Sequence, residues 1–255
     1  MNILCLDIGN THTHHGVLSG GRTLASGQLA TASGSEANAL AELIKSYQRQ
    51  LGLDGIAFCS VVPRATEALR PLLDLNALPV WHLRHDACPG LAIHYPCPAE
   101  IGQDRLANCI GAQTLHGAPA VVIDMGTAVT FDILTDKGYE GGVIAPGLGI
   151  MTRYLHEQTA LLPQLDPADL LVSTGIGKST LDGMRLGCTV GFAGMMDALL
   201  STVLEQLTQW GVPQPAIFAT GGTAGALPKS WQNRILWEPD ITLLGLETAF
   251  YRSRA

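Results

Sequence analysis

Two short turns of the sequence carry an aspartate, a glycine and a threonine in the same order. The first is D-I-G-N-T at residues 7–11 and the second is D-M-G-T at residues 124–127; each follows an apolar run typical of a buried strand. The glycine lets the backbone bend and bring its amides close to a ligand. Amides and hydroxyls bind phosphate oxygens, whereas a carboxylate is suited to hold a cation or its waters. The repetition favours two phosphate-binding turns over ordinary hairpin turns.

A third glycine motif, T-G-G at residues 220–222, stands between a predicted strand and a predicted helix. At such a position the backbone can approach the ribose or a phosphate of a nucleotide closely. The three glycine motifs together predict a nucleotide site.

The run G-Q-D-R at residues 102–105 opens a further predicted helix. Asp104 then lies in the first turn, where the positive end of the helix dipole stabilises a carboxylate. It is expected to be anionic at neutral pH and able to accept a proton from a substrate hydroxyl, although an ordinary aspartate is a weak base with a pKa of about 3.9. Arg105 can pair with a substrate carboxylate or with developing phosphate charge. The alternative is an ordinary charged first turn of a helix.

Three histidines, His12, His14 and His15, follow the first turn. On a strand, His12 and His14 project to one face and His15 projects to the other. Two histidines on one face could begin a zinc site, but no cysteine or histidine pair of matching spacing supplies the other ligands. Polar side chains near a phosphate are the favoured interpretation.

The elements that must position these motifs follow from periodicity and turn residues. Residues 14–30 predict two strands joined at Ser19–Gly20–Gly21, and residues 35–51 predict a helix with Ser35 as its N-cap. Strands are expected at 2–10, 55–62, 118–147 and 215–222, and helices at 64–75, from near Gly102, at 147–160 and at 179–210.

Strands in runs with interspersed helices predict an α/β fold with mixed β-sheets flanked by helices. The repeated turn motif divides the chain near residue 117 into an N-terminal lobe, 1–117, and a C-terminal lobe, 118–255. The first would carry one phosphate turn and the G-Q-D-R run, and the second would carry the other phosphate turn and the T-G-G motif.

Composition excludes several classes of partner. The 255 residues are 47% hydrophobic and 15% charged, with a net charge of −7, which argues against nucleic acid or an anionic membrane as the main partner. The six cysteines contain no C-x-x-C pair and predict buried, reduced thiols. The start M-N-I-L-C-L-D is not typical of a signal peptide, and no apolar run is expected to reach the roughly 20 residues of a membrane span. We therefore expect a soluble, cytoplasmic protein.

The order of the three glycine motifs resembles that of the superfamily of acetate and sugar kinases, heat-shock ATPases and actin. Its members clamp ATP between two ribonuclease-H-like lobes. Within it, Y-P-C-P-A-E-I-G-Q-D-R-L-A-N at residues 95–108 is similar to the type III pantothenate kinases, whose pattern runs tyrosine, a proline-containing loop, G-x-D-R and A-N. The resemblance extends through both D-x-G turns, G-G-V-I-A-P-G at 141–147 and T-A-L-L-P at 159–163, so it covers most of the chain.

The resemblance implies a homodimer that phosphorylates pantothenate with ATP, giving 4′-phosphopantothenate in the first step of coenzyme A biosynthesis. It implies that Asp104 is the catalytic base and that Asp124 binds a monovalent cation, K⁺ or NH₄⁺, while Mg²⁺ accompanies ATP. The residues implied to bind ATP are Asp7, Ile8, Gly9, Asn10, Thr11, His12, Thr13, His14 and Thr127. The residues implied to contact pantothenate are Tyr95, Gly102, Gln103, Asp104, Arg105 and Thr180.

The sequence departs from this family at two places. The family often has an acidic residue where Thr223 follows T-G-G, and residues 173–187 match only loosely. Thr180 could instead be the N-cap of a helix from Leu181. Another small-molecule kinase or a phosphohydrolase of the same superfamily is the alternative enzyme. A non-catalytic regulatory relative is a second alternative, but such a protein would not need all three motif aspartates.

Overall fold

The computed structural model describes residues 1–31, 36–75, 78–165, 170, 175–222, 231 and 233–254. The chain forms two compact units. Unit 1 comprises Met1–Ala120, Asp132–Gly141 and Glu238–Ala255, and unit 2 comprises Val121–Phe131 and Gly142–Trp237. Because each unit is discontinuous in sequence, the single division near residue 117 stays a prediction. Ser35, the expected N-cap, lies outside the described residues.

The sheet of unit 1 is mixed and five-stranded, in the order β3-β2-β1-β4-β5. Strands β1 (Ile3–Ile8), β2 (His12–Ser19) and β3 (Arg22–Ala30) are antiparallel neighbours, whereas β4 (Gly55–Ser60) and β5 (Val80–His82) run parallel to β1. The predicted turn between β2 and β3 is confirmed, since Gly20 and Gly21 both have positive φ.

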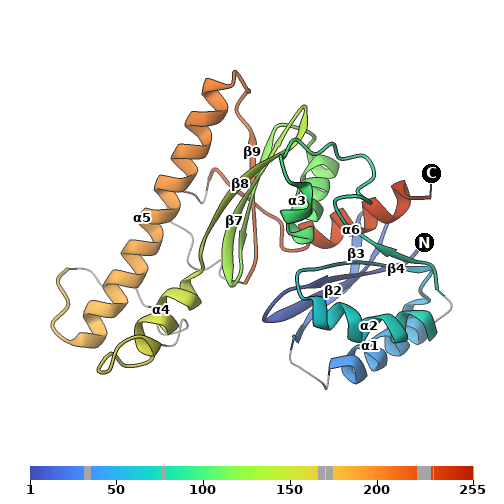
Figure 1. The fold of residues 1–255 in the computed structure, drawn as a ribbon, viewed down its shortest axis with the longest axis horizontal. Helices are drawn as coiled ribbons and strands as arrows, with labels where there is room; N and C mark the ends of the chain where they lie inside the picture. Colours follow the sequence, from blue (N-terminus) through green and yellow to red (C-terminus); the bar gives the residue numbers. More distant parts are fainter. Residues whose placement is uncertain are drawn as a thin grey trace. The chain divides into compact units, whose positions relative to one another are not determined.

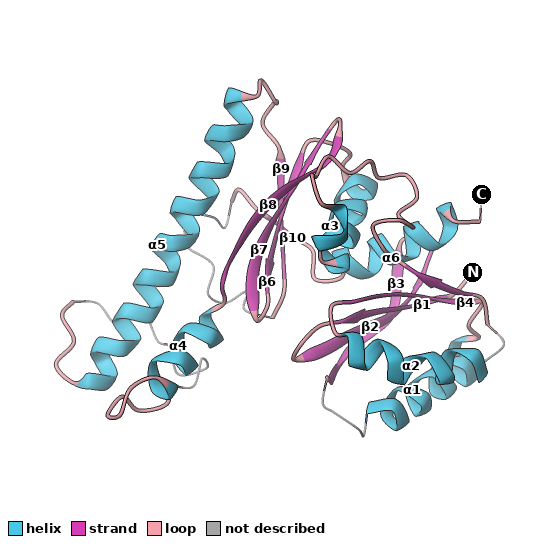
Figure 2. Cartoon of the chain, viewed as in Figure 1, coloured by secondary structure: helices cyan, strands magenta, loops and turns pink. Residues whose placement is uncertain are grey.

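Helices α1 (Glu36–Leu51) and α2 (Pro63–Leu75) cover one face of this sheet (Figures 1 and 2). Apolar side chains alternate along the strands and recur at helical spacing, so they meet in one core. That core includes Leu4, Leu6, Val17, Ile44, Ile56, Phe58 and Leu69. Helix α6 (Ile241–Arg252) packs against β1, β2 and β4.

Helix α3 (Gln103–Leu115), which begins where the sequence predicts, packs closely against α6. Two glycines permit this approach, because a Cβ on Gly111 would collide with the Ile241 carbonyl and a Cβ on Gly245 with the Ala107 carbonyl. A short 3-10 turn (Pro98–Glu100) precedes α3. The C-terminal helix therefore fixes the helix that carries G-Q-D-R.

The second sheet is also five-stranded, in the order β10-β9-β6-β7-β8. Its strands are β6 (Ala120–Met125), β7 (Ala128–Thr135), β8 (Gly138–Pro146), β9 (Ala216–Thr220) and β10 (Leu236–Trp237). Helices α4 (Leu148–Glu157) and α5 (Thr180–Gln209) confirm the helices predicted at 147–160 and 179–210. The two mixed sheets with flanking helices confirm the predicted α/β fold.

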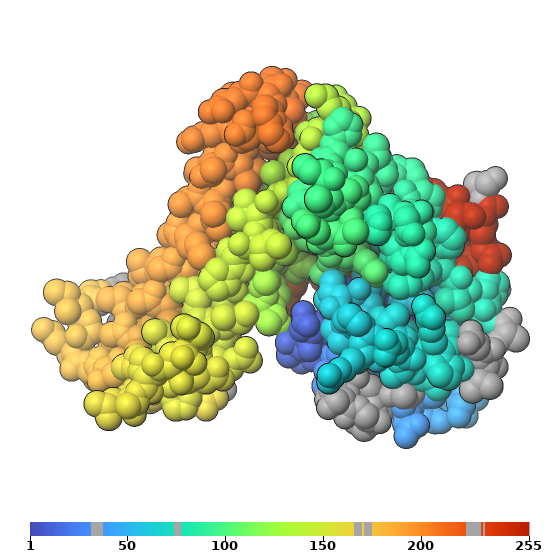
Figure 3. Space-filling view, in the orientation of Figure 1, coloured from blue at the N-terminus to red at the C-terminus, as the bar shows by residue number. Residues whose placement is uncertain are grey.

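Helix α5 is 30 residues long and runs along the surface of the space-filling view in orange (Figures 1 and 3). By length and composition alone it could cross a membrane, which is weak evidence because core helices of soluble proteins pass the same test. The expectation that no apolar run reaches this length is therefore wrong. One face of α5 is buried, through Met184, Cys188, Phe192, Met196, Leu200, Val203 and Leu207.

The cysteines of the described chain are all free. Cys5, Cys59, Cys109 and Cys188 are buried, as the apolar context of their sequence predicts. Cys88 is half-buried and Cys97 is exposed, so burial was wrongly expected for these two thiols.

Candidate active site

The first turn of α3 places the carboxylate of Asp104. Gly102 is the N-cap and contributes no side chain, and a Cβ at this position would lie 2.5 Å from Asp104 Oδ1. The backbone N–H of Arg105 donates to Asp104 Oδ1 over 2.8 Å. Glycine at position 102 is thus required for the carboxylate to fold back onto the helix terminus.

Two opposing effects set the pKa of Asp104. Burial raises this pKa above its ordinary value, and the backbone amide and the guanidinium of Arg105 offset part of the rise. The helix terminus was expected to stabilise the anion, yet desolvation is the larger effect. A carboxylate whose pKa is raised holds a transferred proton more firmly, which suits it to act as a base.

Arg105 is held by a buried polar network. Its Nε donates to Asp132 Oδ1 over 2.5 Å, and Asp132 is fully buried in β7. Asn108 Nδ2 donates to Asp132 Oδ2 over 3.1 Å, and Thr242 Oγ1 of α6 donates to Asn108 Oδ1 over 2.7 Å. Burial raises the pKa of Asp132 to about 6 despite the neighbouring Arg105, so the carboxyl is mostly ionised at neutral pH.

An aromatic ring lies beside the same guanidinium. The Arg105 Cζ atom lies 5.7 Å from the ring centroid of Tyr139, within the range of a cation–π contact. Tyr139 is buried, and its hydroxyl has no hydrogen-bond partner within the described part of the chain. The ring of Tyr95 lies 6.1 Å from that of Tyr139 and against Gly141. Tyr95, implied to contact the substrate, therefore lies next to Tyr139, the ring that contacts Arg105.

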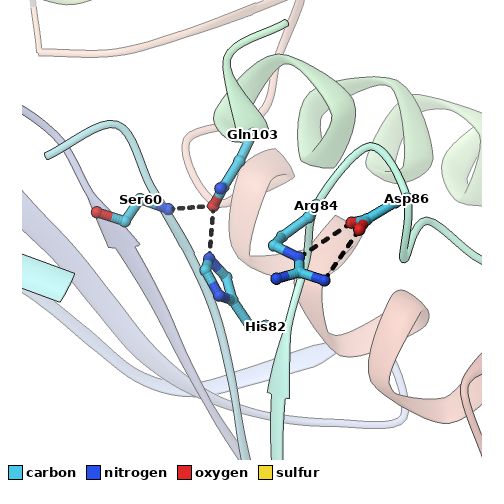
Figure 4. Close-up of polar contacts among 5 residues, drawn as sticks. All are labelled: Ser60, His82, Arg84, Asp86 and Gln103. Atoms are coloured by element: carbon cyan, nitrogen blue, oxygen red, sulfur yellow. Dashed lines mark hydrogen bonds and ion pairs between the residues drawn. The ribbon is translucent and has the colours of Figure 1, made fainter. Parts of the chain in front are cut away.

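Gln103 anchors the start of α3 to the first sheet (Figure 4). Its Oε1 accepts the backbone N–H of Ser60, the last residue of β4, over 2.8 Å. The same oxygen lies 2.9 Å from Nε2 of His82, the last residue of β5. The carboxyl ends of two parallel strands thus hold the helix terminus.

The residue before Ser60 reaches the first phosphate turn. Cys59 Sγ donates to Asp7 Oδ1 over 3.3 Å, and β1 and β4 pair in the register Asp7 with Cys59. Burial raises the pKa of the Cys59 thiol, and the negative charges of Asp7 and Asp104 raise it further. The Asp7 carboxylate is therefore in direct contact with this thiol, and the Asp104 charge also acts on it. The structure brings the first aspartate motif and the G-Q-D-R run to one edge of one sheet.

The turn at residues 7–11 is stabilised by its backbone. The N–H of Gly9 donates to the His12 carbonyl over 3.1 Å, and the N–H of Thr31 donates to the Thr11 carbonyl over 2.8 Å. A Cβ on Gly9 would lie 3.0 Å from the same His12 oxygen. Asn10 and Thr11 are exposed. The turn therefore has the close backbone approach that the glycine predicts.

The histidines of β2 take different partners. His14 Nε2 lies 3.3 Å from Asp240 Oδ1, before α6, and this hydrogen bond lowers the pKa of Asp240. His15 Nδ1 lies 3.2 Å from the hydroxyl of Tyr47 in α1, and burial lowers the pKa of this buried histidine. His12 is exposed. The predicted alternation of faces is confirmed, and a role for His12, Thr13 or His14 in ATP binding stays a prediction.

Unit 2 contains the second turn and the T-G-G motif. Asp124 is half-buried near the end of β6, and the Gly126 N–H donates to the Ala128 carbonyl over 3.0 Å. Gly147, at the start of α4, donates its N–H to the Thr127 carbonyl over 3.1 Å. A Cβ on Gly221 would lie 2.6 Å from the Met125 carbonyl oxygen. Gly147 and Gly221 thus pack against the turn at residues 124–127 so closely that neither position has room for a side chain.

Thr180 is the first residue of α5, in unit 2, and is exposed. The N-cap is Ser179, whose side chain accepts the Asp182 N–H over 3.1 Å, so the alternative of Thr180 as N-cap is wrong. Contact of Thr180 with substrate stays a prediction. Thr223 lies outside the described residues.

Comparison with known proteins decides the family. The model of the type III pantothenate kinase family matches residues 3–202. A type III pantothenate kinase from Akkermansia muciniphila is 43% identical over 197 residues, covering 77% of this chain and 78% of the relative. The chain belongs to the type III pantothenate kinase family. A second family member, from Acidothermus cellulolyticus, is 33% identical and covers 98% of both chains.

Solved structures confirm the fold of this family member. A ROK family glucokinase from Streptomyces griseus, in complex with glucose and AMPPNP, superimposes with a TM-score of 0.59 at 15% identity, covering all of both chains. The predicted α/β fold is therefore confirmed by this likeness, and the predicted family is confirmed by the family model and the relatives.

Sequence reasoning missed three groups of this candidate site. Asp132 and His82 belong to no motif, and Tyr139 lies in a stretch considered only as a strand. Asp132 did carry a signal, because it interrupts the apolar strand V-T-F-D-I-L, where an unpaired charge would be costly. His82 carried none.

Proposed function

We propose that this pantothenate kinase transfers the γ-phosphoryl group of ATP to the primary hydroxyl of pantothenate, giving 4′-phosphopantothenate for coenzyme A synthesis. Family membership supports both substrates. The observation that carries the residue assignment is the end of β4, where Cys59 contacts Asp7 and Ser60 contacts Gln103. These contacts support the proposal, because they bring the turn that begins at Asp7 and the turn that carries Asp104 to the same end of β4.

Asp104 is the base in this proposal. The hydroxyl oxygen of pantothenate forms a bond to the γ-phosphorus, the bond from that phosphorus to the bridging oxygen of ADP breaks, and the hydroxyl proton passes to the Asp104 carboxylate. Phosphoryl transfer depends mainly on position and charge neutralisation, so a carboxylate that accepts the proton late is sufficient. Its raised pKa supports this role.

The acceptor is bound by the first turn of α3 and its surroundings. Arg105, fixed by Asp132, offers guanidinium N–H groups in a defined plane, which suits a carboxylate or carbonyl oxygen of pantothenate. The remaining proposed contacts are Tyr95, Gly102, Gln103 and Thr180.

In this proposal ATP and its ions bind at the two aspartate turns and the T-G-G motif. Because Gly9 and Gly221 have no Cβ, neighbouring backbone can approach them more closely than any other residue would allow. A phosphate-binding turn requires such exposed backbone. We assign the ATP phosphates to Asp7 through His14 and to Thr127. Asp124 would hold a monovalent cation, K⁺ or NH₄⁺. When bound, this cation and Mg²⁺ supply positive charge against the phosphates in an acidic chain.

The proposal includes a cytoplasmic homodimer. Only 28% of the most apolar 18-residue stretch of α5 is buried. The helix exposes Val190, and four of its glycines have open space where a Cβ would lie: Gly183, Gly187, Gly191 and Gly194. Small residues at this spacing permit close packing of two helices. Gly187→Leu should reduce the sedimenting mass to that of a monomer, whereas Gln209→Leu should not.

A coupled assay tests the function. Purified protein with ATP, Mg²⁺, K⁺ or NH₄⁺ and pantothenate should give ADP and phosphopantothenate in equal amounts. Phosphorylation of a different small molecule would favour another kinase, and ADP release without any acceptor would favour a phosphohydrolase. No turnover under any of these conditions would favour the regulatory alternative.

A further inference from the structure

We propose that His82 and the Ser60 backbone amide are positioning groups of the acceptor site. They hold the Gln103 carboxamide in one orientation, so that its nitrogen is presented as a hydrogen-bond donor to an acceptor oxygen of the substrate. The inference rests on the proposed function, because that function places the phosphoryl acceptor at the first turn of α3.

The orientation of the Gln103 side chain follows from its partners. A backbone N–H can only donate, so the atom 2.8 Å from the Ser60 nitrogen must be the carbonyl oxygen Oε1. The opposite flip of the amide would set two donors against each other at this distance. The Ser60 amide is itself fixed, because β4 pairs with β1 in the register Ser60 with Ile8.

The tautomer of His82 follows in turn. Its Nε2 lies 2.9 Å from Gln103 Oε1, which accepts and cannot donate, so Nε2 must carry a hydrogen. Burial lowers the pKa of His82, which favours the neutral Nε2–H form. The ring stacks on Phe58 at a centroid distance of 4.2 Å and 14°, and the parallel register of β4 and β5 places these two residues side by side.

The neighbouring cation takes other partners. Arg84 donates from Nε and Nη2 to the two carboxylate oxygens of Asp86, each over 3.0 Å, and lies beside the Gln103 cluster in Figure 4. Within the described residues, Gln103 Oε1 therefore accepts hydrogen bonds from the Ser60 backbone N–H and from His82 Nε2.

The nitrogen of Gln103 is left for a ligand. Gln103 is half-buried, and among the described residues no acceptor takes a hydrogen from its Nε2, which is not a buried atom. Two oriented N–H groups next to Asp104 suit a carbonyl or carboxylate oxygen and disfavour a cationic group. The anchor also fixes Asp104, the next residue of the same turn.

Four variants separate the anchor from the donor. Gln103→Glu keeps an oxygen for Ser60 and His82 but turns the outward donor into an anionic acceptor, so the KM for pantothenate should rise at least tenfold with the KM for ATP within twofold. Gln103→Met removes both functions and should also lower kcat, because Asp104 is released. His82→Phe keeps the stack and loses the donor, and should raise the pantothenate KM about threefold to tenfold. His82→Gln restores a donor near the Nε2 position and should return KM to within twofold.

The exposed His85→Phe serves as the matched control and should change neither constant. An unchanged pantothenate KM in Gln103→Glu, equal defects in His82→Phe and His82→Gln, or a parallel rise in the KM for ATP would each overturn the proposal. The tautomer gives a readout that needs no substrate. Nitrogen-15 NMR of the full chain should show a protonated Nε2 and an unprotonated Nδ1 in His82. A hydrogen on Nδ1 alone would overturn the anchor, whereas a failure to phosphorylate pantothenate would overturn only the proposed function.

Discussion

The turn after β1 and the first turn of α3 both lie in unit 1 and both reach the end of β4, yet they are built differently. Backbone bonds of Gly9 and Thr31 shape the first. Side chains from other elements hold the second, through His82 on Gln103 and Asp132 on Arg105. The difference teaches that backbone bonds shape the turn proposed for ATP, whereas the turn proposed for the acceptor depends on side chains from residues distant in sequence. Single substitutions should therefore affect the two turns separately.

Asp104→Asn is expected to separate the two turns most strongly, by lowering kcat without changing the affinity for ATP. Loss of the base should reduce kcat by about 10²–10⁴-fold, while the Kd for ATP stays within twofold because the turn at residues 7–11 is untouched. Steady-state kinetics and calorimetric titration with ATP measure the two constants. Glu100→Gln, an exposed carboxylate before the same helix, is the control and should be neutral. A near-normal kcat in Asp104→Asn would remove Asp104 from the mechanism.

Removal of the buried carboxylate should break the acceptor turn and the fold around it. Asp132→Ala leaves the Arg105 guanidinium without its ion-pair partner, so the free energy of unfolding should fall by about 3–5 kcal/mol. The KM for pantothenate should rise more than that for ATP. Urea denaturation and kinetics measure both, with the exposed Asp136→Ala as control. Equal stability of the two variants would mean that the Arg105–Asp132 pair does not support this turn.

The contact between α3 and α6 should be sensitive to a single methyl group. Gly245→Ala forces a Cβ into the Ala107 carbonyl, and the free energy of unfolding should fall by about 1–3 kcal/mol. Gly149→Ala, a helical glycine with open space, should instead be neutral or stabilising by up to about 1 kcal/mol. Thermal denaturation compares them. The same sign for both variants would show that α6 does not fix α3.

A smaller effect is expected at the turn proposed for ATP, and it should change the KM for ATP instead of the KM for pantothenate. In Gly9→Ala the new Cβ would lie 3.0 Å from the His12 oxygen, so the turn must shift by a few tenths of an ångström. The KM for ATP should rise by about twofold to tenfold, with the KM for pantothenate unchanged. A rise confined to pantothenate would contradict the assignment of this turn to ATP.

The pH dependence sharpens the comparison further. Below its pKa, Asp104 holds a proton and cannot accept another, so kcat/KM for pantothenate should fall as the pH decreases. Because burial raises this pKa, the fall should begin above the pH expected for an ordinary aspartate, about 3.9. Asp132, with a pKa of about 6, should steepen it. In Asp132→Asn, kcat/KM for pantothenate should still fall at low pH, because Asp104 remains. A kcat/KM that does not fall at low pH would contradict a carboxylate base.

The same comparison explains what the sequence could reveal. The turn at residues 7–11 and the helix start at Gly102 are local patterns, so glycine positions and apolar periodicity predicted both correctly. His82 and Asp132 act on Gln103 and Arg105 only after strands from distant parts of the chain are in register, and no spacing in the sequence encodes that meeting. The family resemblance implied Arg105, but not the carboxylate that holds it.

Helix α5 shows the same limit in another form. Its buried face follows from residues recurring every third or fourth position, such as Met184, Cys188 and Phe192. Its length of 30 residues agrees with the helix predicted at 179–210, but the expectation that no apolar run reaches the length of a membrane span is wrong. Whether such a helix is covered depends on a surface that the sequence of one chain does not identify.

The central claim is that the substrate hydroxyl meets Asp104 at the first turn of α3. A crystal structure of the full chain with pantothenate and a non-hydrolysable ATP analogue tests it most directly. We predict the primary hydroxyl oxygen within about 3.2 Å of an Asp104 carboxylate oxygen, with Arg105 still bound to Asp132. A hydroxyl that faces another residue, with Asp104 bonded only within its own helix, would contradict this account.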